Sequence, residues 1–357
     1  MALSLFLIGA PGAGKTAVFE ALTNTPEGPH FSTKGAHRLG TVKVPDPRLD
    51  ALRDMYKPKK FTPAEVSFVD VGLPTTREEM NKLSQLTSFL SEADALIIVV
   101  QAFGEYDGAG RALDSAGQLD SVLLELVVSD LEKVERRLER VEKDRGRGLR
   151  ATPENEVRLL ERCKECLESE QSLRTLTLDE EEDKLLRGYQ FLSQKPVLVV
   201  ANVSEDHLDG SGLEPLAAMA AKYGMDTLTF CATLEADIAQ LSPEEQGAFL
   251  SDYGLEEPAS IRLIQAAYSL LQLVSFFTVG EDEVRAWTIR RGTIAHRAAG
   301  KIHSDIERGF IRAETVACEH LIETASWAAC REDATLRLEG KTYVVQDGDV
   351  VHFRHNT

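Results

Sequence analysis

Eight residues near the N-terminus have the types and spacing needed to bind a phosphate group. They read Gly9-Ala-Pro-Gly-Ala-Gly14-Lys15-Thr16 and fit the pattern G-x-x-x-x-G-K-[ST]. Glycines let the backbone fold around an anion with its N–H groups directed inward, and a following helix adds partial positive charge. Lys15 would reach the β- and γ-phosphates of a nucleotide, and the Thr16 hydroxyl would bind magnesium. The predicted phosphate contacts are Gly9, Ala10, Pro11, Gly12, Ala13, Gly14, Lys15, Thr16 and Ala17.

A magnesium ion beside this loop also needs an acidic residue at the end of a neighbouring strand. Asp70 closes the apolar run 66–69 and is predicted to hold the ion through water. Gly72 follows and would present a backbone N–H to the γ-phosphate. Thr33, in the polar loop 30–40, is the candidate second hydroxyl, from its order in the chain alone. The predicted metal ligands are therefore Thr16, Thr33 and Asp70.

Short apolar runs indicate the elements that position these residues. They occur at residues 3–8, 66–69, 95–100, 197–201 and 227–231, with helix-compatible stretches between most of them. Such a pattern is typical of an α/β domain with a mostly parallel sheet covered by helices on both faces.

A heptad pattern interrupts the sheet domain. Leucine and valine recur in alternating steps of three and four, and the pattern breaks at Arg145-Gly-Arg-Gly148. A second helix is predicted with Thr152 as N-cap and Pro153 in its first turn. Two antiparallel helices forming a coiled-coil insertion are expected, packed through Leu124, Val127, Leu131, Val134, Leu138, Val141, Leu160, Cys163 and Leu167.

The C-terminal part is predicted to be a small β-rich domain. Short strands are expected at 276–279, 286–289, 309–313 and 342–345, around a helix near 318–324. The predicted domains are a phosphate-binding core at 1–118 and 193–274, a helical insertion at 119–192 and a C-terminal domain at 275–357.

Composition narrows the class of protein. The 357 residues carry a net charge of −18, which argues against binding nucleic acid by general phosphate attraction, and no sequence-specific DNA binding is expected. The apolar runs are too short to cross a bilayer, no signal peptide is apparent, and an odd count of five cysteines suits a reducing compartment. A cytoplasmic protein without membrane contact is expected. The Cys163-x-x-Cys166 spacing lacks a second pair and is interpreted as helix packing.

Eight segments outside the phosphate loop carry a second, more specific signal. They are Val44-Pro-Asp-Pro-Arg-Leu49, Phe68-Val-Asp70, Val199-Val-Ala-Asn202, Cys231-Ala-Thr-Leu-Glu-Ala-Asp-Ile238, Val284-Arg-Ala-Trp-Thr-Ile289, Ala299-Gly-Lys-Ile-His303, Gly309-Phe-Ile-Arg-Ala313 and Asp347-Gly-Asp-Val350. With these segments the chain resembles the YchF/Obg-like ATPase family over nearly its whole length. The resemblance implies an Obg-type G domain with a coiled-coil hairpin, a TGS domain with a β-grasp core, and association with ribosomes through RNA or protein contacts of these two parts.

The C-terminal part also contains a cluster of basic residues. Such a cluster suits RNA phosphate, and a solvated surface is the alternative interpretation. The residues are Arg285, Arg290, Arg291, Arg297, Lys301, Arg308 and Arg312.

The segment that would read the base favours adenine. GTPases use N-K-x-D, whereas this chain has Asn202-Val-Ser-Glu205, which is similar to the N-x-x-E of the family and its preference for ATP. Asn202 would pair with adenine N6 and N7, while Val203 and Phe103 enclose the ring. The resemblance places Cys231, Ala232 and Thr233 in the loop over the base. ATP is the expected ligand, and GTP a weaker one.

Hydrolysis is the least determined property. The Asp-x-x-Gly switch of the family is one residue short here, at Asp70-Val-Gly72-Leu73, and no glutamine follows to orient water. The resemblance places a hydrophobic residue, Leu73, at the glutamine position and implies slow turnover with magnesium, stimulated by potassium or a partner. The predicted catalytic group is Lys15, Asp70, Gly72 and Leu73. A nucleotide-binding scaffold without hydrolysis stays open, and a small-molecule kinase is disfavoured because no arginine-rich lid segment follows.

Overall fold

The computed structural model describes residues 3–24, 37–71, 89–147 and 152–356, and these form two compact units. One unit comprises Leu3–Gly40 and Ser67–Ser260, and the other comprises Thr41–Val66 and Ile261–Thr357. The predicted domain boundaries stay a prediction, because this division follows contacts and keeps the helical insertion with the first unit. No helix in the described part of the chain is both long and apolar enough to cross a membrane.

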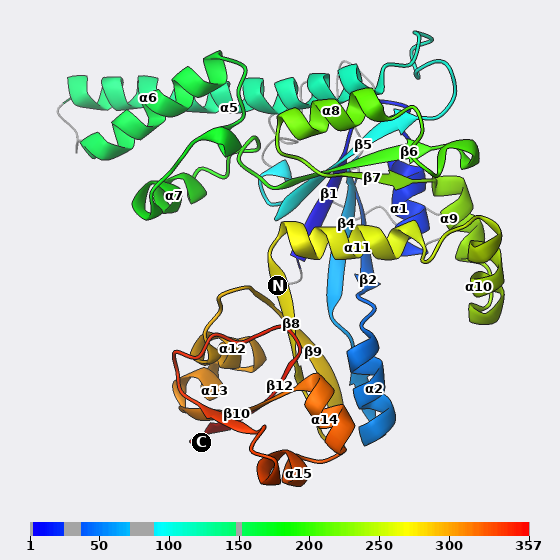
Figure 1. Ribbon diagram of the computed structural model, residues 1–357. Helices are drawn as coiled ribbons and strands as arrows, with labels where there is room; N and C mark the ends of the chain where they lie inside the picture. Colours follow the sequence, from blue (N-terminus) through cyan, green and yellow to red (C-terminus); the bar gives the residue numbers. More distant parts are fainter. Residues whose placement is uncertain (1–2, 25–36, 72–88, 148–151, 357) are drawn as a thin grey trace. The chain divides into compact units, whose positions relative to one another are not determined.

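The first sheet has six strands, and the expected α/β class is confirmed. Its order is β2-β4-β1-β5-β6-β7, and the pairs β1–β5, β5–β6 and β6–β7 are parallel (Figure 1). The strands β5 and β6 are almost wholly buried, as their continuous apolar runs predict. The strands span Leu3–Ile8 (β1), His37–Lys43 (β2), Glu65–Val71 (β4), Ala95–Ala102 (β5), Val197–Val203 (β6) and Thr227–Phe230 (β7).

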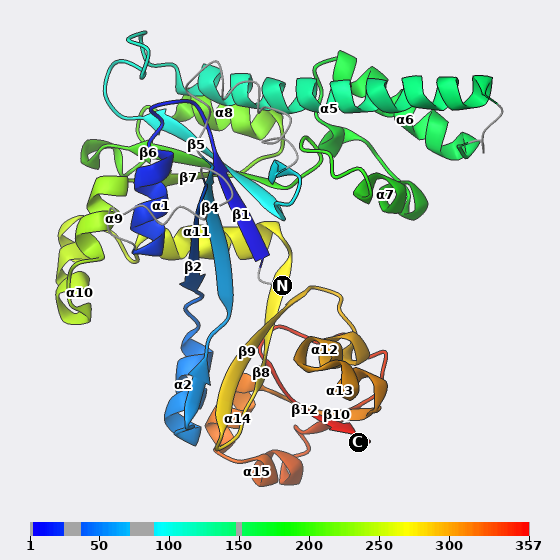
Figure 2. The same cartoon turned by 180° about the vertical axis from the view of Figure 1, so that it is seen from behind.

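Helices cover both faces of the described part of this sheet. Helices α5 and α8 lie against one face and α1 against the other, where α1 also contacts α9 (Figure 2). Apolar side chains of α5, α8 and the even-numbered residues of β1 and β5 share one core cluster. The helices of this unit are Lys15–Thr23 (α1), Ser115–Gly146 (α5), Glu205–His207 (η2), Glu214–Lys222 (α8), Ala232–Ile238 (α9) and Pro243–Asp252 (α10). The next helix, Ala259–Leu270 (α11), belongs to the second unit from Ile261 onward.

The helical insertion has its own core. Helix α5 packs against α6 (Glu154–Glu168), with η1 (Leu173–Thr175) and α7 (Glu180–Arg187) beside them. Two details of the prediction are wrong. Leu124 is 41% exposed, while its neighbours Leu123 and Leu126 pack into the core of the first sheet. Helix α6 begins after Pro153, which is its N-cap, and has no side-chain cap from Thr152.

The second unit is a six-stranded mixed sheet with short helices. Its order is β11-β10-β12-β8-β9-β3. The predicted strand at 342–345 is wrong: only an isolated bridge joins Ile294 to Val344, and the segment turns so that Tyr343 and Gln346 reach Asp349 at the start of β12. The elements are Pro47–Tyr56 (α2), Lys60–Thr62 (β3), Leu273–Thr278 (β8), Glu283–Arg290 (β9), Ala295–Ile302 (α12), Ser304–Arg308 (α13), Phe310–Ala317 (β10), Cys318–Thr324 (α14), Trp327–Glu332 (α15), Arg337–Glu339 (β11) and Asp349–His355 (β12).

One motif quoted above has a structural role in this unit. Asp46 caps α2 by accepting the backbone N–H of Arg48, and the Arg48 guanidinium donates to Asp46 and to Asp347 at 2.9 Å. Asp347 also accepts the backbone N–H of Ser275. The Val44-Pro-Asp-Pro-Arg-Leu49 segment therefore fastens α2 to the C-terminal sheet.

Candidate nucleotide site

The phosphate loop lies between the end of β1 and the start of α1, as the sequence predicts. A Cβ at Gly9 would lie 2.1 Å from the carbonyl oxygen of Val99, so only glycine lets the loop approach β5 this closely. Gly14 is the N-cap of α1 with φ of +84°. Pro11, Gly12, Thr16 and Ala17 are exposed, which leaves this end of the loop open to a ligand.

The Lys15 ammonium is folded onto its own loop. It donates to the carbonyl oxygens of Gly9 and Ala10, both at 3.0 Å. Burial lowers the pKa of Lys15, and the nearby charge of Asp70 opposes this shift. A phosphate group would offer the ammonium a charged acceptor in place of two neutral carbonyls, and a charged acceptor forms the stronger hydrogen bond.

Thr16 and Asp70, from elements far apart in sequence, meet beside the loop. The Thr16 hydroxyl donates to Oδ2 of Asp70 at 2.8 Å. Asp70 is 6% exposed, and its Oδ1 is buried with no hydrogen-bond partner in the described structure. A hydroxyl and a buried carboxylate with one unpaired oxygen form the hard oxygen donor set that suits magnesium. Thr33, Gly72 and Leu73 lie outside the described residues.

Asn202 joins three elements beside the phosphate loop. The residue is 4% exposed, and its side chain donates to the carbonyl of Ala13 at 3.1 Å and accepts the backbone N–H of Ala232 at 3.3 Å. These bonds connect β6, the phosphate loop and α9. They use one of the two amide N–H groups and one of the two lone pairs of the amide oxygen, so the pairing with adenine stays a prediction.

The other residues predicted to contact the base differ in how far they are buried. Val203 is 3% exposed and packs in the apolar core, and its contact with the ring stays a prediction. Phe103 is half-buried and approaches the loop, with Cε1 at 3.8 Å from an ideal Cβ on Gly14. Cys231 and Ala232 are buried at the start of α9, and exposed Thr233 lies 3.2 Å from the Cys231 sulfur.

The sequence analysis did not identify two residues that contact this region. Tyr253 donates its hydroxyl to Glu205 at 3.1 Å, which fixes the carboxylate at the position where GTPases carry aspartate. Gln101, 5% exposed at the end of β5, donates to the carbonyls of Phe103 and Tyr106 and so anchors the following loop. A lone amide ending an apolar strand was the one available signal for Gln101.

The Cys163-x-x-Cys166 pair is packing, as interpreted above. Both thiols are buried, and burial raises the pKa of Cys163 to about 12, which keeps it protonated. Within the described ranges, no group of three or more histidine, cysteine or acidic residues is placed to hold a metal ion.

We expect Gly14→Ala to weaken both the fold and nucleotide binding. The new Cβ would lie 2.2 Å from Nδ2 of Asn202, and the residue would keep a φ of +84°, which costs about 1–2 kcal/mol for L-residues. Urea denaturation should show a free energy of unfolding lower by about 1–3 kcal/mol. Gly146→Ala is the control, because a Cβ there meets nothing within 4 Å. Equal unfolding midpoints for the wild type and Gly14→Ala would contradict the close contact.

Comparisons with known proteins place these features in a family. A family model, YchF-GTPase_C, described as a protein of unknown function (DUF933), matches residues 273–356. The chain is 41% identical to a Bacillus subtilis (strain 168) protein named ribosome-binding ATPase YchF, with 100% of both chains covered. It is 38% identical to the Escherichia coli O157:H7 protein of the same name, with 98% of each covered. A solved structure, described as the Schizosaccharomyces pombe YchF GTPase, has a TM-score of 0.84 at 27% identity and covers 99% of this chain and 97% of its own.

Proposed function

Because this chain belongs to the YchF family, we propose that it is a ribosome-associated ATPase that binds ATP in the phosphate loop and hydrolyses it slowly. The observation that carries this proposal is the pair of Thr16 and Asp70 beside Lys15, with Oδ1 of Asp70 buried and unpaired. Magnesium and ATP are the proposed cofactors, potassium a further one and GTP a weaker ligand. The partner contacts are proposed for the C-terminal unit and the helical insertion.

The residues would divide the work as follows. Backbone N–H groups of the loop and the N-terminus of α1 bind the phosphates, and Lys15 neutralises part of their charge. Thr16 and Asp70 would hold magnesium, which supplies further charge neutralisation at the β- and γ-phosphates when bound. Asp70 orients the Thr16 hydroxyl by accepting a hydrogen bond from it, with 2.8 Å between the two oxygens. The direct test is magnesium-dependent phosphate release by the purified protein.

Base choice is a separate part of the proposal, because the names of the relatives disagree. The bacterial relatives are named ATPases and the Schizosaccharomyces pombe structure is described as a GTPase. We propose ATP, because this chain lacks both the lysine and the aspartate of N-K-x-D, and Glu205 is already bonded to Tyr253. Parallel titration with ATP and GTP tests this, and equal or tighter GTP binding would refute it.

We expect Asn202→Ala to weaken ATP and GTP binding by a similar factor, up to about 30-fold. The change removes two hydrogen bonds, worth about 1 kcal/mol each, that join the phosphate loop to β6 and α9 rather than to a base. Isothermal titration with both nucleotides measures the two factors. Asn155→Ala on exposed α6 is the control. A loss confined to ATP would show that Asn202 reads adenine after all.

A second candidate function is a nucleotide-binding scaffold without hydrolysis. It is favoured by the switch of Asp70-Val-Gly72-Leu73, which is one residue shorter than the family pattern. ATP binding without any magnesium-dependent phosphate release would select this candidate over the ATPase.

A further inference from the structure

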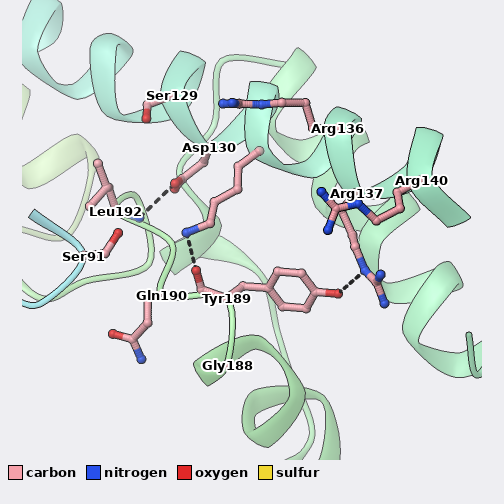
Figure 3. A pocket seen from close by; sticks show the side chains of 11 residues that line it. Ser91, Ser129, Asp130, Arg136, Arg137, Arg140, Gly188, Tyr189, Gln190 and Leu192 are labelled. Carbon is pink, nitrogen blue, oxygen red and sulfur yellow. Dashed lines mark hydrogen bonds between the residues drawn. The ribbon is translucent and has the colours of Figure 1, made fainter. Parts of the chain in front are cut away.

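A second cavity of the first unit lies away from the phosphate loop. It has a volume of about 580 Å³ and is formed by one side of α5, the segment 188–192 that follows α7, and Ser91. Four of its lining residues are cations, Lys133, Arg136, Arg137 and Arg140. Their spacing of three, four and seven residues places them on one face of α5. Figure 3 shows Arg136, Arg137 and Arg140 on this helix and Tyr189 and Gln190 on the facing segment.

The wall has more positive than negative charge. Asp130 is the one carboxylate among the described lining residues, it is 1% exposed, and its oxygens already accept the backbone N–H groups of Leu192 and Ser193 at 2.9 and 2.7 Å. Burial and the neighbouring charge of Arg136 lower the pKa of Lys133, and Asp130 opposes this. An added anion would therefore relieve repulsion among the cations.

The four cations fall into two groups by what they bond. Lys133 donates to the carbonyl of Tyr189, and Arg137 donates to the Tyr189 hydroxyl at 3.1 Å and to Glu156 at 2.8 Å, so both hold the cavity together. Among the described residues, Arg136 bonds only to Glu132, within its own helix. Arg140 is exposed and has no hydrogen bond or ion pair to another described residue. These two arginines are available to a ligand.

We propose that this cavity binds the phosphodiester backbone of RNA, with Arg136 and Arg140 as the principal contacts. Guanidinium groups bind phosphate oxygens bidentately, and Ser129 and Gln190 add the neutral donors typical of backbone contacts. Residues 133–140 extend over about 10 Å of helix, which suits successive phosphates better than one group. The choice of RNA over a free polyphosphate rests on the ribosome association proposed above.

The test is fluorescence anisotropy with a short fluorescein-labelled RNA hairpin, titrated with wild-type protein and with Arg136→Gln/Arg140→Gln at several salt concentrations. We expect the double variant to bind about tenfold or more weakly, with a salt dependence of log K less steep by about two. Neither arginine bonds beyond its own helix, so thermal unfolding should not change. Arg158→Gln is the control for the loss of one positive charge, because Arg158 is an exposed arginine of α6 outside the cavity, and it is compared with the single variants Arg136→Gln and Arg140→Gln.

Three outcomes would overturn the inference. The first is that the double variant binds RNA as tightly as the wild type, and the second is that Arg158→Gln loses as much affinity for RNA as the cavity variants. The third is that equimolar pyrophosphate displaces the hairpin, which would assign the cavity to a small polyphosphate. ATP binding and phosphate release are measured on the same proteins. RNA binding without ATP binding would contradict the proposed ATPase function and support the RNA site. ATP turnover without RNA binding would support the ATPase function and contradict the RNA site.

Discussion

Lys15→Ala should lower the affinity for ATP by about 100-fold, which corresponds to about 2.7 kcal/mol. The ammonium now bonds to the carbonyls of Gly9 and Ala10, and in the complex it would bond to charged phosphate oxygens. Hydrogen bonds to charged groups contribute about 1.5–3 kcal/mol, so replacing the lysine should reduce the binding free energy by an amount of this order. Isothermal titration with ATP and magnesium measures the change.

The control for this variant is Lys222→Ala, which removes an exposed lysine of α8. The free energy of unfolding of Lys15→Ala should be equal to that of the wild type or slightly higher, because the variant no longer buries an ammonium whose pKa is lowered by burial. Unaltered ATP affinity in a folded Lys15→Ala protein would remove the phosphate loop as the nucleotide site.

The same lysine predicts how binding depends on pH. Because its pKa in the free protein lies below the ordinary 10.5, Lys15 loses its proton at a lower pH than an exposed lysine. Bound phosphate favours the charged form, so ATP affinity should fall as pH rises through the alkaline range, and the fall should begin below pH 10.5. The slope should vanish in Lys15→Ala. An identical alkaline slope in both proteins would assign it to another group.

The strands were predictable where burial on both sides requires continuous apolar residues. The strands β1, β5 and β6 are apolar except for Ser4, Gln101 and Asn202, and each was located within a few residues. Strand β2, which reads His37-Arg-Leu-Gly-Thr-Val-Lys43, was missed because it is an edge strand with exposed and half-exposed residues. Strand β12 was missed because its alternating pattern, with His352 and Arg354 outward, is weaker than a buried run.

The candidate site was predictable only where one short segment contains all the information. The phosphate loop needs one strand, one turn and one helix, all adjacent in sequence. For Asn202 the sequence did not indicate its contacts within the protein, because Ala13 and Ala232 come near it only in the folded domain. Tyr253 was missed for the same reason, since nothing near it in sequence indicates that it reaches Glu205.

The basic cavity shows a similar limit. The heptad pattern predicted the packed face of α5, and the sequence analysis did not single out Arg136 or Arg140 on its outer face. Whether such a face is merely solvated or forms a site depends on the segment 188–192, which returns to α5 only after α6 and α7 have formed. Tertiary contacts, rather than helix periodicity, create the concave surface.

Asp70→Asn should reduce magnesium-dependent phosphate release by about 100-fold or more, the size of effect found when a charge-stabilising group is removed from an active site. Asparagine keeps the shape of the side chain and can still accept the Thr16 hydroxyl, so the loop should stay in place. The carboxylate charge is lost, and the amide would direct an N–H donor into the place of an oxygen that is now buried and unpaired. A cation is therefore repelled where it was attracted. Phosphate release as a function of magnesium concentration measures this.

A matched control separates this effect from general loss of a carboxylate in the sheet. Asp94→Asn removes a charge whose oxygen accepts the backbone N–H of Ser4, a contact that an amide oxygen can replace. We expect Asp94→Asn to retain turnover and Asp70→Asn to lose it, while both bind ATP in the absence of magnesium with similar affinity. Undiminished turnover in Asp70→Asn would mean that the Thr16–Asp70 pair is structural, and the switch that follows Asp70 would then have to supply the catalytic groups.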